Sequence, residues 1–196
     1  MADATRMVDG VEIPAPGVWE VDPAHSRLGF VARHLMVTKV RGSFDVFDGR
    51  IAVGERPEDS SVAVRVDTAS ITTGSADRDT HLKSADFLDV ERFPTMTFRS
   101  TKVERNGDAG LRLEGELTVR DVTRPVTLDA EFDGLTDDPW GGKRVAFTAT
   151  TEIDREDWGM TWNVALEKGG VLVSKKVQIE IDVQAKYVAA AASEAA

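Results

Sequence analysis

Along most of the chain, hydrophobic and polar residues alternate one by one. The clearest run is VQIEIDVQAKY (177–187), in which the apolar residues and Ala185 share one parity and the amide and charged residues share the other. The same alternation covers residues 62–66, 111–119, 126–132 and 145–153. Because successive side chains of a strand point to opposite faces, the pattern predicts antiparallel strands with one apolar and one wet face.

Turn signals separate these runs. Asn106-Gly107 lies between the runs 96–104 and 111–119 and predicts a hairpin, and Asp138-Pro139 marks another turn. In GSFDVFDGRI (42–51) the apolar positions change parity, which predicts a bulge or a sharp bend.

A single segment departs from the period of two. Residues 75–84 predict a short helix, with Ser75 as the N-cap, Leu82 facing inward and Asp79 four residues before Lys83. One helix cannot cover the apolar faces of so many strands, so those faces meet each other in a sandwich or a closed barrel. Strands longer than the usual five or six residues favour a tall barrel, whose interior can hold one small ligand.

Composition narrows the possible partners. The 196 residues are 41% hydrophobic, and 34 acids against 24 bases give a net charge of −10. An acidic chain lacks the basic footprint that nucleic acid requires, and its charge argues against electrostatic docking on anionic membrane surfaces, so we expect only transient contact with a membrane. With no cysteine, a disulfide framework and a thiolate metal site are excluded.

The chain ends predict flexible segments around one domain. We expect a flexible N-terminal tail over 1–16, a barrel domain over 17–188 and a flexible Ala-rich tail over 189–196. The N-terminal segment has acids among small residues and no apolar core of a signal peptide, so we expect a cytoplasmic protein.

Five motifs, in order along the chain, resemble those of the YceI-like family of lipocalin-like polyisoprenoid-binding proteins. They are W-x-V-D-x-x-H-S-x-L-x-F-x-x-R-H (19–34), V-x-G-S-F (40–44), R-D-x-H-L-K-S-A-D-F-L-D-V-x-x-F-P (78–94), L-x-G-E-L-T-V-R-D-V-T-R-P-V (113–126) and D-W-G-M-x-W (157–162).

The resemblance implies an all-β fold, an extended eight-stranded antiparallel barrel with one short helix near one end. It also implies a long hydrophobic tunnel that accepts a polyisoprenoid or a similar amphiphilic lipid. Many relatives are exported to the periplasm, and because the N-terminal segment shows no apolar core of a signal peptide, we expect this chain to differ from them in location. Relatives often pair through strand faces or edges, so a homodimer is a possible assembly.

Parity and the resemblance together predict the residues that line the tunnel. These are Phe30, Phe44, Val64, Leu113, Leu117, Phe132, Phe147, Trp158, Trp162 and Ile179. Trp158 and Trp162 have an alternative interpretation as ordinary core aromatics.

The histidines and the helix supply candidate head-group contacts. His34 has the inward parity of Leu28 and Phe30 and is a candidate to meet a lipid head group, as are Arg78 and His81 if the helix covers the barrel end. Alternatively, His34 bonds a backbone carbonyl, and the helix residues pair on a solvated face.

His25 has the outward parity and is expected to face solvent or sit at the rim. Asp22, His25 and Ser26 are crowded into one turn, and no G-x-S-x-G elbow is present, so we assign no catalytic residue. The three histidines lack the spacing of a metal site, and we assign no metal and no cofactor other than a bound polyisoprenoid, quinone or fatty-acid-like lipid.

The sequence therefore predicts a non-catalytic protein that binds, sequesters or carries an isoprenoid or similar lipid. Two alternatives stay open. One is an enzyme for a hydrophobic substrate that uses His34 or His81 as a base. The other is a cavity-free domain that acts through protein contacts in a stress response.

Overall fold

The computed structural model describes residues 4–8, 11–107, 110–167 and 169–189. The strands are β1 (Thr5–Val8), β2 (Val11–Pro14), β3 (Gly17–Val21), β4 (Arg27–His34), β5 (Thr38–Phe44), β6 (Phe47–Val53), β7 (Ser61–Asp67), β8 (Ile71–Thr72), β9 (Thr95–Arg105), β10 (Gly110–Val119), β11 (Val122–Asp137), β12 (Lys143–Asp154) and β13 (Lys176–Ala189). The helix α1 spans Ala76–Lys83, and 3-10 turns lie at Pro23–His25, Pro57–Asp59, Thr68–Ser70 and Arg155–Trp158.

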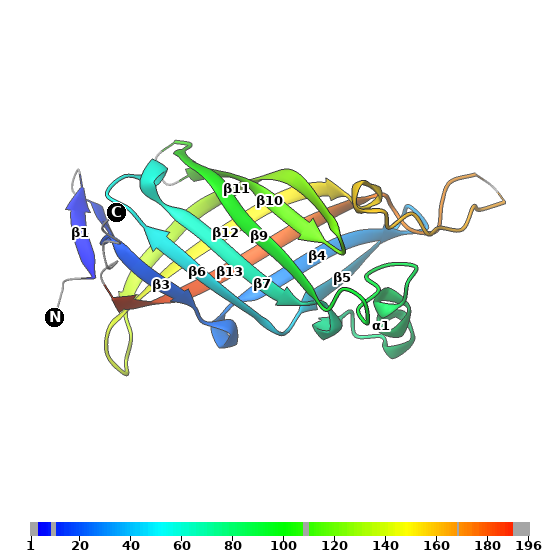
Figure 1. The fold of residues 1–196 in the computed structure, drawn as a ribbon, viewed down its shortest axis with the longest axis horizontal. Coiled ribbons are helices and arrows are strands. Elements are labelled where there is room, and N and C mark those ends of the chain that lie inside the picture. Colours follow the sequence, from blue (N-terminus) through cyan, green and yellow to red (C-terminus); the bar gives the residue numbers. More distant parts are fainter. Residues whose placement is uncertain (1–3, 9–10, 108–109, 168, 190–196) are drawn as a thin grey trace.

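In the described part of the chain, the strands form a closed antiparallel barrel. Its hydrogen-bonded ring runs β3-β6-β7-β9-β10-β11-β12-β13, and β13 closes it by pairing with both β12 and β3. Adjacent ring strands follow one another along the chain from β9 to β13, whereas β4 and β5 lie between β3 and β6 in the chain, and β8 lies between β7 and β9. The eight-stranded barrel predicted from the sequence is confirmed, and its long axis is horizontal in Figure 1.

Three of the long strands that form the barrel wall are each interrupted once. β3 and β4 pair one after the other with the same edge of β13. The pairing of β3 includes Val21↔Ala185, that of β4 includes Arg27↔Asp182, and the turn at Pro23–His25 lies between them. β5 and β6 are divided in the same way at Asp45-Val46, where the parity changes, and β7 and β8 by the turn at Thr68–Ser70. The bend predicted within residues 42–51 is therefore present.

The N-terminal segment contains more structure than the sequence predicted. β1 and β2 pair antiparallel, from Thr5↔Pro14 to Val8↔Val11, and Ala4 is buried. Within the predicted tail over 1–16, residues 5–8 and 11–14 therefore form a two-stranded sheet that the sequence analysis did not predict. Asp9-Gly10, between these two short apolar runs, is the hairpin signal that could have predicted the pairing. Of the tail predicted over 189–196, Ala189 is the last residue of β13, and residues 190–196 lie outside the described residues.

The helix α1 lies near one end of the barrel (Figure 1). Ser75 occupies the N-cap position but makes no side-chain capping bond, and Leu82 packs inward as predicted. Asp79 accepts hydrogen bonds from the backbone N–H of Thr73 at 2.8 Å and from its hydroxyl, in place of the predicted pairing with Lys83.

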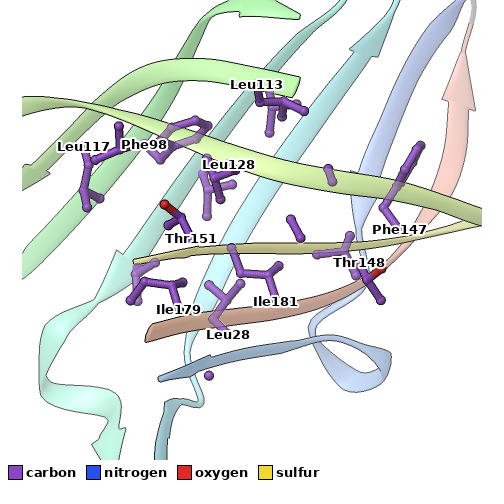
Figure 2. Close-up of a pocket in the computed structure, with 18 of the residues that line it drawn as sticks. Leu28, Phe98, Leu113, Leu117, Leu128, Phe147, Thr148, Thr151, Ile179 and Ile181 are labelled. Atoms are coloured by element: carbon purple, nitrogen blue, oxygen red, sulfur yellow. The ribbon is translucent and has the colours of Figure 1, made fainter. Parts of the chain in front are cut away.

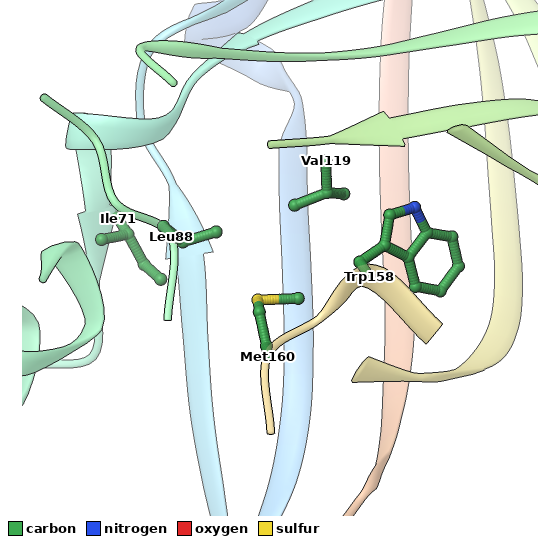
Figure 3. Packing of buried hydrophobic residues seen from close by; sticks show 5 residues of the cluster. All are labelled: Ile71, Leu88, Val119, Trp158 and Met160. Carbon is green, nitrogen blue, oxygen red and sulfur yellow. The ribbon is translucent and has the colours of Figure 1, made fainter. Parts of the chain in front are cut away.

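Buried side chains fill the two barrel ends and leave the middle to the cavity described below. At the α1 end the buried residues are Ile71, Leu88, Val119, Trp158 and Met160 (Figure 3). At the opposite end Trp19, which is fully buried, packs edge-on against Tyr187 with ring centroids 5.1 Å apart, and Val145 and Ala185 lie beside it. No helix among the described residues is long and apolar enough to cross a membrane.

Candidate ligand-binding cavity

The barrel encloses a cavity of about 880 Å³ that runs between the two buried clusters. Its walls are made by the inward-facing residues of the ring strands and of β4 and β5. Figure 2 shows Leu113, Leu117, Leu128, Ile179 and Ile181 directing their side chains toward this common interior. The volume lies within the ~300–1,000 Å³ range of small-molecule sites.

The alternation of the sequence explains why the lining is apolar. The inward parity of β13 places Val177, Ile179, Ile181 and Val183 in the wall, and the inward parity of β7 places three valines there (Val62, Val64, Val66). Their outward neighbours are mostly charged or polar. The period-two prediction of the apolar face is confirmed on both strands.

One glycine makes room for an aromatic wall residue. Phe30 and Gly42 are directly opposite each other on β4 and β5. A Cβ at Gly42 would press on the Phe30 ring and lie 2.8 Å from the carbonyl oxygen of Thr72. Phe30 therefore occupies the space over Gly42, with the Phe44 ring at 5.9 Å between centroids.

The charges at the cavity are all of one sign. Among the described residues that line it, the charged side chains are Arg6, Arg105 and Arg155, and no aspartate or glutamate is present. This contrasts with a chain that carries 34 acids and 24 bases. The interior is thus an apolar tube whose charged wall residues are cationic.

Most of the predicted lining residues do face this cavity. Eight of the ten line it: Phe30, Phe44, Val64, Leu113, Leu117, Phe132, Phe147 and Ile179. Trp158 does not, because its ring is buried in the cluster at the α1 end and its Nε1 donates to the carbonyl of Leu117 at 3.1 Å. Trp162 is also absent from the lining, and it packs against His81 and Phe87.

The three predicted head-group residues lie outside the cavity lining. His34 is exposed at the end of β4, where it pairs with Thr38 and forms an isolated bridge with Val173, and it is not among the residues that line the cavity. Arg78 donates to the hydroxyl of Thr73 at 2.7 Å and to its carbonyl at 3.0 Å. Their contact with a head group stays a prediction that this geometry does not support.

His81 forms part of the wall behind the cavity. Its Nε2 lies 2.8 Å from a carboxylate oxygen of Asp86, and its ring stands edge-on to Trp162 and Phe87 at 4.5 and 5.1 Å. These contacts attach α1 to the loop that follows β12, because Trp162 belongs to that loop. His81 therefore positions one end of the barrel.

Asp22, His25 and Ser26 do not form a nucleophile with its base. Nδ1 of His25 is 3.0 Å from Asp22, and the His25 ring is half exposed, as its outward parity predicted. The hydroxyl of Ser26 instead donates to the carbonyl of Gln184 at 3.2 Å and accepts from the backbone N–H of Gln184 at 3.0 Å. Ser26 is thus a hydrogen-bonded link between β13 and the start of β4.

Asp22 is the centre of a charged network on the outside of the barrel. Arg144 donates to Asp22 from Nη1 and to Asp138 from Nε, both at 2.7 Å, and Lys186 lies 3.4 Å from Asp22. The guanidinium of Arg144 holds the pKa of Asp22 far below its usual range. The backbone N–H of Trp140 and the same guanidinium lower the pKa of Asp138. The network ties the β11–β12 turn to the end of β3.

Within the described residues, no three His, Cys, Asp or Glu side chains are grouped so that they could hold a metal ion.

At the α1 end of the cavity, sequence reasoning predicted that Leu82 faces inward but missed Phe87, Leu88 and Arg155. Leu82, Phe87, Leu88 and Met160 line this end from the helix, the following loop and the segment after β12, together with Arg155. The first three belong to the long motif at 78–94, but none has strand parity, so alternation could not assign them to the wall. Arg155 carries no local signal in the sequence.

A closed up-and-down barrel of eight long strands around an apolar cavity is the architecture of the lipocalin-like proteins. A family model described as the YceI-like domain matches residues 19–185. The chain belongs to the YceI-like family.

Relatives and solved structures agree with this assignment. Protein YceI of Salmonella newport is 44% identical over 138 residues, which cover 70% of this chain and 72% of the relative. A UPF0312 protein of Vibrio cholerae is 40% identical over 138 residues, covering 70% of this chain and 73% of its own.

Three solved structures share the fold. The Campylobacter jejuni YceI protein has a TM-score of 0.69 and 26% identity, covering 80% of this chain and 90% of its own. BcnA of Burkholderia cenocepacia has a TM-score of 0.72 and 21% identity, covering 84% and 98%. A polyisoprenoid binding domain of Saccharophagus degradans has a TM-score of 0.61 and 14% identity, covering 89% and 100%. The last two, with their low identities, show the fold alone.

Proposed function

We propose that the barrel binds one amphiphilic lipid, with its hydrocarbon tail in the cavity, and carries or sequesters it without a catalytic step. A polyisoprenoid, a quinone with an isoprenoid tail and a fatty-acid-like lipid are the candidate ligands. The observation that carries the proposal is the apolar cavity of about 880 Å³. It is several times the size of the ~150 Å³ engineered cavity that holds one benzene.

The shape of the cavity favours a long tail over a compact molecule. Lining residues extend from Leu82 and Phe87 at the α1 end to Arg105 and Phe132 at the other. A chain laid along this axis contacts inward-facing residues of every ring strand. The name of the Saccharophagus degradans domain, which refers to polyisoprenoid binding, supports a ligand of this chemistry for a barrel of the same fold.

Energetics favour the role of a carrier. Burying each CH₂ group from water is worth ~0.8 kcal/mol. A membrane lipid, however, leaves a bilayer that is as apolar as the cavity, so the net free energy of transfer is small. Length and shape of the cavity then select the tail, and release to an acceptor membrane stays feasible.

The proposal assigns no general base inside the barrel. His34 and His81, the two candidates for that role, are not among the lining residues. Should either act as a base, its replacement by Ala would abolish turnover of a hydrophobic substrate while leaving lipid uptake intact.

A direct experiment combines extraction and uptake. The protein is purified without detergent, its bound lipid is extracted and identified by mass spectrometry, and the delipidated protein is titrated with prenyl lipids of increasing length. We expect a co-purified lipid and uptake at one per barrel. Absence of both would overturn the proposal.

A matched pair of variants locates the uptake. Leu113→Trp places an indole in the cavity and should reduce uptake of long prenyl lipids at least tenfold, while Arg112→Trp, on the exposed face of the same strand, should leave it unchanged. Equal uptake by both variants would place the bound lipid outside the barrel.

A further inference from the structure

Arg155 is a buried cation at the α1 end of the cavity. It follows β12 at the start of the turn Arg155–Trp158, is only 3% exposed and belongs to the cavity lining. Its Nε donates to the carbonyl of Ser174 at 3.0 Å, and its Nη1 donates to the carbonyl of Met160. Its Nη2 is buried and has no hydrogen-bond partner among the described residues.

The positive charge of Arg155 has no direct counter-ion among the described residues. Its two acidic neighbours along the chain are engaged elsewhere. Asp154 accepts from the backbone N–H of Glu156 at 3.0 Å, and Glu156 pairs with Lys175 at 2.7 Å. Burial lowers the pKa of Arg155, although a guanidinium stays protonated in proteins. A buried charge without a partner is costly, and such groups are normally paired.

The two other cationic lining residues differ from Arg155. Arg6 forms an ion pair with Glu55, and Arg105 is exposed at the end of β9, at the barrel end away from α1. Phe87, whose ring centroid is 5.7 Å from Cζ of Arg155, adds an aromatic wall beside the guanidinium. The α1 end thus combines a free, desolvated donor with apolar surroundings.

We propose that Arg155 binds an anionic head group, a phosphate or a carboxylate, of the lipid in the cavity. This inference rests on the proposed function and adds the class and the orientation of the ligand. The head group lies at the α1 end against Nη2, and the tail runs through the barrel toward Trp19. A planar guanidinium offers donors in the geometry that phosphate and carboxylate oxygens accept, and a charged hydrogen bond is stronger than a neutral one.

Two lipids with one tail test the proposal. The delipidated protein, loaded with the neutral fluorescent probe N-phenyl-1-naphthylamine, is titrated with farnesyl phosphate and with farnesol. We expect farnesyl phosphate to bind roughly 10- to 100-fold more tightly, the range that a charged hydrogen bond supplies. Inorganic phosphate alone should not displace the probe, because it lacks the tail.

Variants identify the group responsible. In Arg155→Gln the preference for farnesyl phosphate should disappear while farnesol binds as in the wild type, which also shows that the cavity is intact. Arg112→Gln, on the exposed face of β10, should keep the preference. If Arg155→Gln does not fold, Arg155→Lys keeps the charge but loses the planar donor pair, and the preference should fall several-fold.

The outcomes separate this inference from the proposed function. Equal affinity of the wild type for both lipids, or a preference that survives Arg155→Gln or is lost in Arg112→Gln, would overturn the head-group site while lipid binding stands. Displacement by inorganic phosphate alone would show a free-anion site in place of a lipid site. Failure of both lipids to bind would overturn the proposed function itself.

The tip hairpin, defined as residues 33–41 at the β4–β5 turn, exposes bulky apolar side chains. Leu35 and Met36 have φ of 53° and 59°, a left-handed conformation that non-glycine residues adopt at a cost, and both are exposed. Val37 is 78% exposed, and Val164 on the neighbouring loop is 45% exposed. Bulky apolar side chains are thus held in water in a turn that would suit Asn-Gly better.

The flanks of the tip hairpin are cationic. Arg33 and Lys39 are directly opposite on β4 and β5, and Arg41 follows on the same face. None of the three forms an ion pair with a described residue, and residues 33–41 contain no acid. Like charges directly opposite each other are destabilising, so the arrangement favours an external anionic partner.

We infer that the tip hairpin contacts an anionic bilayer, with its apolar side chains in the interface and its cations at the lipid phosphates. The net charge of −10 opposes this, but charges farther than ~8 Å are largely screened at physiological salt. The tip hairpin is joined to the α1 end through Ser174, whose Oγ accepts from the N–H of Arg33 at 2.9 Å and whose carbonyl accepts from Arg155. The loop beside it extends past the barrel in Figure 1.

Vesicle sedimentation tests this contact. We expect the protein to sediment with vesicles of phosphatidylglycerol and phosphatidylcholine, and to lose at least half of this binding with phosphatidylcholine alone. The double variant Arg33→Glu, Lys39→Glu and, separately, Val37→Ser should bind several-fold less, while Arg65→Glu, on the exposed face of β7, should bind as the wild type. Absence of sedimentation, or equal loss in Arg65→Glu, would overturn the inference.

Discussion

Replacing Ala149 with Phe tests whether the barrel interior is hollow. Ala149 lies in β12, lines the cavity, and faces Ala130 and Ile181 on the neighbouring strands. In a tightly packed interior, the added ring would push these neighbours apart and cost ~1–3 kcal/mol. In a cavity of about 880 Å³, the ring has space to occupy. Burial of a Phe side chain contributes ~1.5–3 kcal/mol, and ordering it costs roughly 0.5–1 kcal/mol.

We therefore expect Ala149→Phe to stabilise the delipidated protein by about 0.5–2.5 kcal/mol, the difference between those two magnitudes. The measurement is urea unfolding of delipidated protein, in which the midpoint rises while the slope stays constant. Thr150→Phe, one residue further on the exposed face, is the control and should change stability by less than about 0.5 kcal/mol. A loss of 1 kcal/mol or more in Ala149→Phe would refute the reasoning.

Three further predictions follow from other positions. Leu117→Asp puts a carboxylate into the apolar wall and should lower the free energy of unfolding by about 3 kcal/mol or more. The control Glu116→Lys, on the exposed face, should change it by less than about 0.5 kcal/mol. Thermal melting measures both effects. Gly42→Ala forces a Cβ against the carbonyl of Thr72 and should cost ~1–3 kcal/mol in urea unfolding; a neutral result would contradict the close approach. Because the pKa of Asp22 is lowered in the folded state, its ion pairs stabilise the protein above the unfolded pKa of ~3.9 and are lost as the pH falls further. Asp22→Asn should thus lower stability at pH 7, with a difference that shrinks below pH ~4, as acid titration followed by circular dichroism can show.

The strand faces could be predicted from the sequence because alternation is a local property. Leu113 and Leu117 share a parity in one short run, and both line the cavity. Closure of the barrel is a different matter, since it depends on β13 pairing with β3, far away along the chain. Alternation alone left a sandwich and a barrel open, and the family resemblance decided between them.

The structure departs from the expected side-chain directions where the alternation of residues no longer applies. His34 continues the inward parity of Phe30, but it is exposed at the end of β4 and is not among the residues that line the cavity. Trp162 lies in the loop after β12, where no period applies, and it packs on His81.

Arg155 shows the limit of local patterns most clearly. Nothing in the residues REDW (155–158) distinguishes Arg155 from the exposed arginines of the chain. Its burial results from Phe87, Met160 and Ser174, which come from three separate segments, converging on it. A property produced by that convergence is visible only in the folded structure.

A crystal structure of the delipidated protein soaked with a prenyl phosphate that carries a bromine at the tail end addresses the lipid-binding account most directly. We predict elongated density inside the barrel, with the phosphate at Arg155 and the anomalous bromine signal toward Trp19. Density for the lipid only on the outer surface, or an interior filled by the chain's own side chains, would contradict it.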